Sequence, residues 1–402
     1  MSNILGFTTY PVKFPLHGGQ RRITAFAEFY RRIGLNYEAV CIYEPGSYSS
    51  DKVGPFDLPL KYLDGTRKDL PFLGDLLSGI YGANDAAVIE HFSKIIQRKM
   101  PLAIVLEQPF MWPLLEKIRR DPMIAKIPMI YSSQNWEAPL KFEMLARNGV
   151  DRVTAWEVAR QIDELERSAT KASRLIFSCS EADAKIYRDI DPEKQVIVIK
   201  NGVNRPSKTA GAKGPLPDFS DARYLFFVGS AYPPNIDGLC DLLLEGGLFF
   251  MPPRKGFAIC GGATEGIFQD PRYQKFLDSN NERVRFFKEI SDEELDLVKA
   301  KAHAILLPIK FGGGSNLKTA EALAAGKWVT ASPVAMRGFE EFLDQPGVVV
   351  ADGPKHFRQA VIKALNSPPL ELTEAAKEMR ESVYWDRRFG NLKWQDFGLT
   401  FS

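Results

Sequence analysis

The sequence predicts an α/β protein built from two Rossmann-like, doubly wound domains that face a cleft. Short apolar strands alternate with amphipathic helices along the whole chain, a pattern typical of parallel sheets with crossover helices. With 402 residues, the chain is too long for one ordinary core and suits two domains of roughly 200 residues each. Between the two series of strands, residues 205–221 are rich in Pro, Gly, Ser and Lys and show no hydrophobic periodicity, which indicates a linker.

These observations predict where the domains begin and end. We expect an N-terminal domain over residues 1–204, a linker over 205–221 and a C-terminal domain over 222–384. The aromatic-rich segment 385–402 is expected to pack back on the N-terminal domain. Doubly wound sheets bind ligands at the carboxyl ends of their strands, so the site should lie in the strand-to-helix loops.

The first half begins with a strand at Ile4–Thr9, a loop over residues 15–19 and a helix from about Gln20 to Ile33. Further along, a long helix carries apolar residues at every third position, close enough to the helical period to predict one buried stripe. This stripe consists of Val153, Trp156, Ala159, Ile162, Leu165 and Ala169. The remaining strands predicted in this half are Ala39–Tyr43, Leu102–Leu106, Met129–Ser132, Leu175–Ser178 and Val196–Lys200.

The second half repeats the alternation after the linker. Helices are predicted at Asp292–Lys301 and Leu317–Ala325. The predicted strands are Tyr224–Gly229, Gly256–Cys260, Val284–Phe287, Ala304–Pro308, Trp328–Ser332 and Gly347–Val350.

Composition and charge exclude several classes of protein. Hydrophobic residues make up 45% of the chain and charged residues 25%, as in soluble globular proteins. The formal net charge is only +2, and residues 1–200 hold 27 Lys and Arg against 25 Asp and Glu. Nucleic-acid binding as the main activity needs a visible excess of positive charge, so no nucleic-acid partner is expected.

The cysteines and the apolar segments predict a cytoplasmic protein. The four cysteines lack CxxC spacing and are interpreted as small buried residues in a reducing compartment. The N-terminus does not resemble a secretory signal, and no apolar stretch approaches the ~18 residues that span a bilayer.

No metal or cofactor site is predicted. The four histidines are scattered, and they form neither a metal-binding pattern nor part of a Ser/His/Asp triad. The segment 189–191 has the DxD pattern of some metal-dependent transferases, but Pro192 follows at once. We interpret it as a polar turn between a helix and a strand.

The most informative segment is the loop between the strand ending at Pro308 and the helix beginning near Ser315 or Asn316. Its glycines, Gly312, Gly313 and Gly314, allow the backbone to turn with positive φ and to approach a ligand closely. Ser and Asn are good N-caps, and the free N–H groups of a helix start form an anion site suited to a diphosphate. The segment matches neither the Walker loop nor GxGxxG.

Two charged residues follow this loop in the predicted helix. Lys318, one turn in, adds a full positive charge to the anion site. Glu321 is placed to accept hydrogen bonds from the 2′- and 3′-hydroxyl groups of a ribose. The residues alone leave a second interpretation open, in which Glu321 is a solvated helix residue paired with Lys318.

The segment GGGSNLKTAEALAAGKWV resembles the donor-binding segment of family-4 glycosyltransferases, which have the GT-B fold and retain anomeric configuration. Other segments resemble that family in the same order along the chain, and the similarity is more specific in the second half. They are Gly18-Gly19, residues 133–137 (SQNWE), residues 200–204 (KNGVN), residues 224–238 (YLFFVGSAYPPNIDG), residues 257–262 and residues 287–295 (FKEISDEEL).

The resemblance implies roles for particular residues. It implies that Glu321 holds the donor ribose and that Lys318, with the N–H groups of Asn316 and Leu317, holds the diphosphate. Residues 312–315, which end in Ser315, would lie beside the transferred sugar. Further donor contacts are implied for Gly229, Asn235, Phe287 and Glu289, close approach to the phosphates for Gly18 and Gly19, and acceptor contacts for Glu107, Gln108 and Asn135.

Three positions depart from the family's pattern. Gly313 stands where many members have the first of two acidic residues. Residues 231–238 lack the usual Arg and Lys, and Lys310 is the candidate to compensate. Glu107 and Gln108 occupy the neighbourhood of a common histidine.

The resemblance implies a hexosyltransferase-type enzyme of polysaccharide biosynthesis that uses a UDP- or GDP-type sugar donor and a hydroxyl acceptor. We expect it to work without metal or cofactor and with possible association at the inner face of the membrane. Two alternatives stay open: a sugar-nucleotide epimerase or hydrolase of the same fold, and a catalytically degenerate partner subunit.

Overall fold

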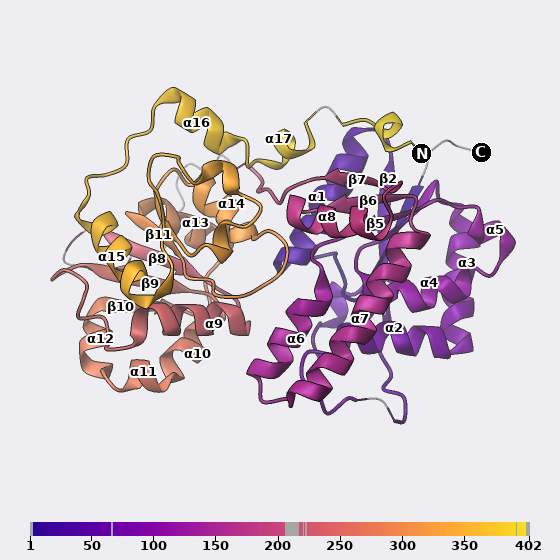
Figure 1. Ribbon diagram of the computed structural model, residues 1–402, viewed down its shortest axis with the longest axis horizontal. Coiled ribbons are helices and arrows are strands. Elements are labelled where there is room, and N and C mark those ends of the chain that lie inside the picture. Colours follow the sequence, from indigo (N-terminus) through magenta and orange to yellow (C-terminus); the bar gives the residue numbers. More distant parts are fainter. Residues whose placement is uncertain are drawn as a thin grey trace. The chain divides into compact units, whose positions relative to one another are not determined.

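A computed structural model of the chain describes residues 3–65, 67–205, 217–219, 221, 223–390 and 392–398. The chain forms two compact units, Met1–Lys200 with Phe389–Ser402 and Asn201–Arg388. Each has a parallel sheet with helices on both faces (Figure 1). The α/β fold class predicted from the sequence is therefore confirmed. Most of the predicted linker, residues 206–216, lies outside the described residues.

The first unit has a seven-stranded parallel sheet in the order β3-β2-β1-β4-β5-β6-β7. Its strands are β1 (Asn3–Thr8), β2 (Asn36–Tyr43), β3 (Leu58–Pro59), β4 (Ala103–Leu106), β5 (Met129–Ser132), β6 (Leu175–Ser178) and β7 (Gln195–Val198). Its helices are α1 (Gly18–Arg32), α2 (Gly74–Asn84), α3 (Ala86–Lys99), α4 (Trp112–Ile118), α5 (Pro122–Ala125), α6 (Glu137–Arg147), α7 (Arg152–Ala172) and α8 (Glu181–Ile190). The short β3 was not predicted, because two residues at a sheet edge leave no periodic signal.

The second unit has a six-stranded parallel sheet in the order β10-β9-β8-β11-β12-β13. Its strands are β8 (Tyr224–Val228), β9 (Gly256–Cys260), β10 (Val284–Phe287), β11 (Ala304–Leu307), β12 (Trp328–Ala331) and β13 (Val348–Val350). Its helices are α9 (Pro233–Leu239), α10 (Ala263–Gln269), α11 (Pro271–Gln274), α12 (Leu277–Arg283), α13 (Asp292–Lys301), α14 (Leu317–Ala324), α15 (Gly353–Asn366), α16 (Glu374–Glu381) and α17 (Trp385–Phe389).

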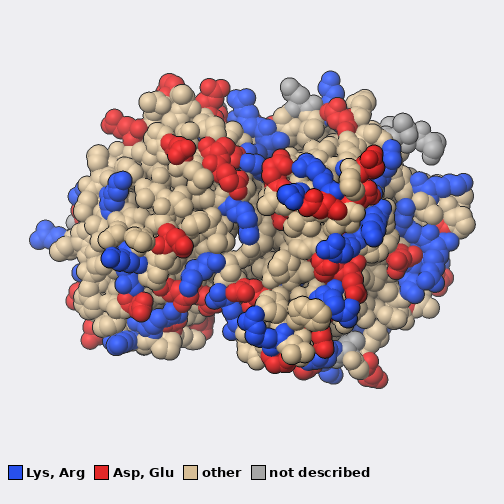
Figure 2. Space-filling view, in the orientation of Figure 1, with Lys and Arg blue, Asp and Glu red and all other residues tan. Residues whose placement is uncertain are grey.

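Each unit buries its own apolar core. In the second unit the two faces of the sheet form separate clusters, and α13 and α14 cover the face that carries Phe226, Ile305 and Leu307. All four cysteines are buried thiols, as expected. Lys, Arg, Asp and Glu side chains are interspersed over the visible face of the molecule (Figure 2).

Two details of the first unit correct the sequence-based expectations. The stripe predicted in α7 is wrong at its start, since Val153 and Trp156 are 68% and 58% exposed. The buried residues of α7 are instead Ala155, Val158, Ile162, Glu166, Ala169 and Thr170. A repeat of three residues drifts around a helix of 3.6 residues per turn, so one end of such a stripe leaves the core. Helix α1 also begins at Gly18, two residues before the expected start.

No helix among the described residues is long and apolar enough to cross a membrane. The segment 189–191 was predicted to be a turn, but Asp189 and Ile190 are the last residues of α8 and Asp191 is its C-cap, ahead of β7.

Candidate functional site

The candidate donor site lies at the topological switch point of the second sheet. The chain leaves β8 for β9 and β10 on one side and then returns to β11 on the other. The carboxyl ends of β8 and β11 are therefore neighbours from which the connections diverge, and ligands of doubly wound sheets bind in such crevices. The two segments after these strands are residues 229–232 before α9 and residues 308–316 before α14.

Helix α9 approaches the end of β11 closely. A Cβ at Gly238 would lie 1.9 Å from the carbonyl oxygen of Pro308, so a side chain there would force the backbone apart. Gly229 is similarly confined, because its carbonyl accepts the N–H of Ala263 at 2.9 Å and its N–H donates to Cys260 at 3.0 Å. Glycine at position 238 lets the two segments of the switch point lie against each other, and Gly229 lies against the start of α10.

The glycine loop adopts the backbone conformation that its sequence predicts. Gly312 has φ +147° and Gly314 has φ +56°, both in the region that favours glycine. Asn316 is the N-cap of α14, and its side chain accepts the N–H of Lys318 at 3.0 Å. Among the described residues, the N–H groups of Asn316 and Leu317 have no protein acceptor. They are two of the donors that the resemblance assigns to the diphosphate.

Lys318 links the two segments of the switch point. Its ammonium donates a hydrogen bond to Oδ1 of Asn235 in α9 and lies 5.7 Å from the centre of the Phe227 ring. Burial lowers the pKa of Lys318 to about 8, and the nearby charge of Glu321 opposes this shift. The structure therefore brings Lys318 and Asn235 together.

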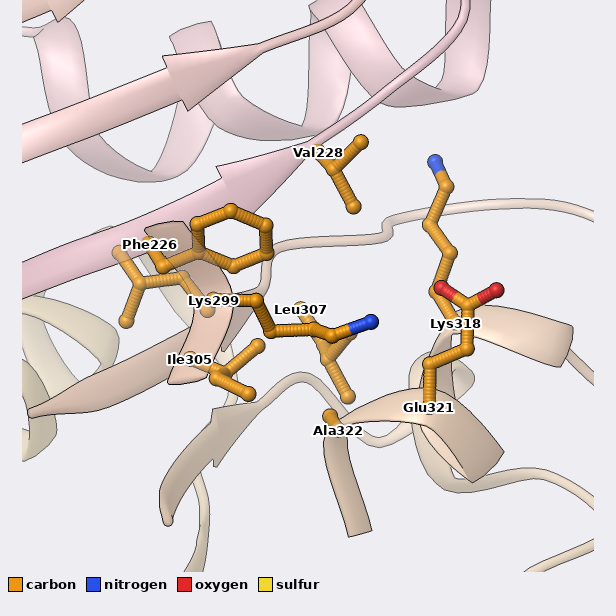
Figure 3. Close-up of a pocket in the computed structure, with 9 residues that line it drawn as sticks. Phe226, Val228, Lys299, Ile305, Leu307, Lys318, Glu321 and Ala322 are labelled. Atoms are coloured by element: carbon orange, nitrogen blue, oxygen red, sulfur yellow. The ribbon is translucent and has the colours of Figure 1, made fainter. Parts of the chain in front are cut away.

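Glu321 lines a small pocket between α13 and α14. Figure 3 shows its carboxylate beside the Lys318 side chain, while Lys299 extends from α13 toward it. Lys299 also forms an ion pair of 2.6 Å with Asp296. The remaining lining is mainly apolar and comprises Phe226, Val228, Ile305, Leu306, Leu307 and Ala322. The pocket thus combines an apolar floor with one carboxylate and two ammonium groups.

The other donor-side candidates have different environments. Ser315 is buried, and Asn201 donates through Nδ2 to its carbonyl at 2.7 Å. Phe287 is half-buried at the end of β10, where its carbonyl accepts the N–H of Gly261 at 2.8 Å. Glu289 is exposed in the loop that follows.

Lys310 has a carboxylate partner that was not expected. Lys310 was the candidate to replace the missing basic pair, but its ammonium lies 2.6 Å from a carboxylate oxygen of Asp241. Asp241 also binds Arg272. Lys310 and Arg272 lie 69 and 31 residues from Asp241 along the chain, so no local pattern predicts these ion pairs.

Sequence reasoning also missed Arg337, which follows the short helix η4 (Val334–Met336). Its guanidinium donates from Nε to the carbonyl of Gly314 at 2.9 Å and from Nη2 to the carbonyl of Gly312. The sequence signal was an arginine shortly after a strand end, which is too common to single out.

The switch point of the first unit lies between β1 and β4. Gly18 and Gly19 form the first turn of α1, and a Cβ at Gly19 would lie 2.2 Å from the hydroxyl oxygen of Tyr10. Gln108 accepts hydrogen bonds through Oε1 from the hydroxyl of Thr8 and the N–H of Thr9, each at 3.0 Å.

Two buried carboxyl groups lie near this edge. Glu107 accepts the hydroxyl of Tyr37 at 2.6 Å, and burial raises the pKa of Glu107 to about 7. Asn135 donates to Glu137 at 2.9 Å, and burial likewise raises the pKa of Glu137 to about 7. Each acceptor-side candidate is therefore hydrogen-bonded to its own partner within the first unit.

Comparison with solved structures defines the class of the fold. Sucrose-phosphate synthase from Thermosynechococcus elongatus superposes with a TM-score of 0.70 at 15% identity, covering 99% of this chain and 97% of that one. The catalytic domain of starch synthase IV from Arabidopsis thaliana, bound to ADP and acarbose, gives 0.60 at 12% identity, covering 99% and 98%. Anabaena HepE in complex with UDP and glucose gives 0.54 at 14% identity, covering 99% and 97%. The chain has the two-domain α/β fold of GT-B glycosyltransferases.

The sequence of the second unit is more specific. Residues 222–367 match the family model of glycosyl transferases group 1. A search among curated proteins finds no significant match. The chain therefore carries a glycosyltransferase group 1 domain and is an enzyme of the glycosyltransferase type. This domain contains β8 to β13 and the whole of the candidate donor site apart from Asn201.

Proposed function

We propose that this enzyme transfers a sugar from a nucleotide-diphosphate donor to a hydroxyl acceptor, with retention and without a metal ion, as in family-4 glycosyltransferases. The observation that carries the proposal is the arrangement around α14. A glycine loop with unbonded N–H groups, a half-buried lysine and a carboxylate lie together at the switch point of a glycosyltransferase group 1 domain.

Each group has a role in donor binding. The N–H groups of Asn316 and Leu317 and the ammonium of Lys318 bind the diphosphate, since a helix start and a fixed positive charge favour an anion. Glu321 accepts hydrogen bonds from the ribose hydroxyl groups. Phe287 and Glu289 lie beside the base, and the segment 312–315 lies beside the sugar.

The chemistry requires charge stabilisation on the leaving group. The bond between the anomeric carbon and the β-phosphate oxygen breaks, and its electron pair leaves with the nucleoside diphosphate. The acceptor oxygen forms the new bond to the same face of the sugar, and its proton passes to the departing phosphate. Lys318 and the loop N–H groups are placed to stabilise the charge that develops there.

The relatives support a nucleotide donor. HepE was solved with UDP and glucose, and also with UDP-glucose. For this chain we propose a UDP- or GDP-type donor and an acceptor that is a glycan, a lipid-linked saccharide or a similar hydroxyl compound. Glu107, Gln108 and Asn135 are the acceptor-side candidates, and association with the inner face of the membrane is part of the proposal.

Thermal unfolding of the full chain with UDP, GDP, ADP and their sugars tests the donor. A nucleotide present at 100 times its Kd stabilises the folded state by about 2.7 kcal/mol, which gives a measurable rise in Tm. No rise with any nucleotide would refute the proposal.

Turnover then separates the alternatives. Release of nucleoside diphosphate that depends on an added hydroxyl acceptor is the expected result. Conversion of the donor without an acceptor would indicate an epimerase or hydrolase. Binding without turnover in any acceptor mixture would indicate a degenerate partner subunit.

A further inference from the structure

One arginine binds two backbone carbonyls of the glycine loop, residues 312–314. The guanidinium of Arg337 binds the carbonyl oxygens of Gly312 and Gly314, two residues apart, with two different nitrogens. A planar guanidinium with several N–H groups is the side chain best suited to bridge two acceptors in this way. A lysine ammonium is a compact point donor and does not reproduce that geometry.

Because the carbonyls of the loop are bound, peptide geometry determines where the neighbouring N–H groups point. In a planar trans peptide, the carbonyl of one residue and the N–H of the next point in opposite directions. Because Arg337 binds the carbonyls of Gly312 and Gly314, the N–H groups of Gly313 and Ser315 point away from the guanidinium. Within the described part of the chain, these two N–H groups have no acceptor. Together with those of Asn316 and Leu317, four N–H groups of the segment 313–317 are therefore without a protein acceptor among the described residues.

Charge distinguishes Arg337 from the other basic residue of this loop. Lys310 is neutralised by its ion pair with Asp241. Arg337 is half-buried, and its recorded acceptors are backbone carbonyls; none of the described carboxylates lies within ion-pair distance of it. Its positive charge therefore acts on whatever occupies the other side of the loop.

The segment that carries Arg337 is fixed to α14. The hydroxyl of Thr319 in α14 donates to the carbonyl of Ala335 at 2.6 Å, two residues before Arg337. On the other flank, Asn201 binds the carbonyl of Ser315. The loop is thus held at three carbonyls, and its N–H groups are fixed before any ligand arrives, which lowers the cost of ordering them on binding.

We propose that Arg337 is a positioning residue for diphosphate recognition: it aims the N–H groups of Gly313 and Ser315 at the donor's β-phosphate, where the sugar beside this segment is attached, and adds uncompensated positive charge behind them. This inference rests on the proposed function and extends it to a residue outside the loop. It gives Arg337 the role that was expected for Lys310, which is to supply the positive charge missing from residues 231–238.

The test compares Arg337→Met and Arg337→Lys with the unchanged protein in the full chain. Titration calorimetry or competition measures affinity for the nucleoside diphosphate that binds best, and for the nucleoside alone. Arg337→Met should lose at least tenfold in diphosphate affinity, about 1.4 kcal/mol, with nucleoside affinity within twofold of the unchanged protein. Arg337→Lys should recover less than half of this loss in free energy, because one ammonium does not hold both carbonyls.

Arg283 supplies a matched control, since its guanidinium also donates to two backbone carbonyls, those of Met251 and Pro252. Arg283→Met should alter Tm without changing the ratio of diphosphate to nucleoside affinity. An unchanged ratio in Arg337→Met overturns the inference, as does full recovery in Arg337→Lys. If the unchanged protein binds no nucleoside diphosphate, the proposed function fails first, and the inference fails with it.

Discussion

The two switch points of this molecule have the same topology and opposite chemistry. In the first unit, side chains that follow β1 and β4 bond to one another, and two buried carboxyl groups with raised pKa lie near them. In the second unit, the equivalent loops present backbone N–H groups and a half-buried lysine with a lowered pKa. The same sheet topology thus places carboxyl groups near the switch point of the first unit, and a lysine and unbonded N–H groups at that of the second. The sheet topology determines where a ligand binds, whereas the residues of the loops determine which charge of ligand the site suits.

Replacement of Lys318 should have the largest effect on this contrast. Lys318→Ala removes the charge that faces the departing diphosphate, and loss of one such donor costs about 3 kcal/mol in the barrier, or two to three orders of magnitude in turnover. Steady-state turnover with a saturating donor measures this. Lys301→Ala, in an exposed lysine at the end of α13, is the control. Normal turnover in Lys318→Ala would show that Lys318 does not stabilise the departing diphosphate.

Glu321→Ala should chiefly weaken donor binding. Hydrogen bonds to a charged group contribute about 1.5 to 3 kcal/mol, so the donor's KM and Kd should rise by about one to two orders of magnitude with a smaller change in kcat. The affinities for the ribonucleotide and for its 2′-deoxyribose analogue should also be compared, because this tests whether Glu321 binds the ribose hydroxyl groups. The unchanged protein should discriminate between them, and the variant should not. The exposed Glu378→Ala should behave as the unchanged protein.

Donor binding should weaken at alkaline pH. The pKa of Lys318 is about 8 in the free protein, so above pH 8 the lysine loses its proton, and binding of a diphosphate requires proton uptake. Affinity for the nucleoside diphosphate should therefore fall by up to tenfold per pH unit above pH 8. Lys318→Arg, which stays charged, should flatten the profile. A flat profile in the unchanged protein would contradict the role of Lys318.

Glu107→Gln should keep donor affinity within twofold of that of the unchanged protein. It should instead change how the free energy of unfolding depends on pH. The pKa of Glu107 is raised to about 7, so between pH 4.5 and 7 the unfolded state loses a proton that the folded state keeps. Stability therefore falls as pH rises through this window, and the variant should reduce that slope by at most about 1.4 kcal/mol per pH unit.

Denaturant unfolding across this pH window measures the slope. Glu116→Gln, in an exposed residue of α4, supplies the control. A slope identical to that of the unchanged protein would show that Glu107 does not titrate in this range.

Much of the fold could be predicted from the sequence because its signals are local. Strands β5, β6, β9 and β10 and helix α13 have the predicted bounds, since apolar runs and capping residues are contiguous in the chain. The exposed start of α7 was not predicted, because a count of apolar residues does not say which of them face the core. Trp156 there is apolar and exposed.

The candidate site could be predicted only in part, for the same reason. The glycine loop and the cap at Asn316 follow from adjacent residues. The contacts of Lys310 with Asp241 and of Arg337 with the loop join residues that are distant in sequence, and such pairings follow from tertiary packing. Long-range contacts decide which charges are available to a ligand.

The path of the chain limits how the molecule can be dissected. Phe389 stacks on Phe29 with ring centroids 4.5 Å apart, and Phe397 lies 5.2 Å from Phe177, so the last described helices complete the core of the first unit. Residues 201–388 form one continuous stretch that can be excised as a fragment, whereas the first unit needs two separated stretches. A fragment that stops at residue 200 would leave Phe29 and Phe177 without these aromatic partners. Production of the isolated first unit therefore requires a linker that joins residue 200 directly to residue 389.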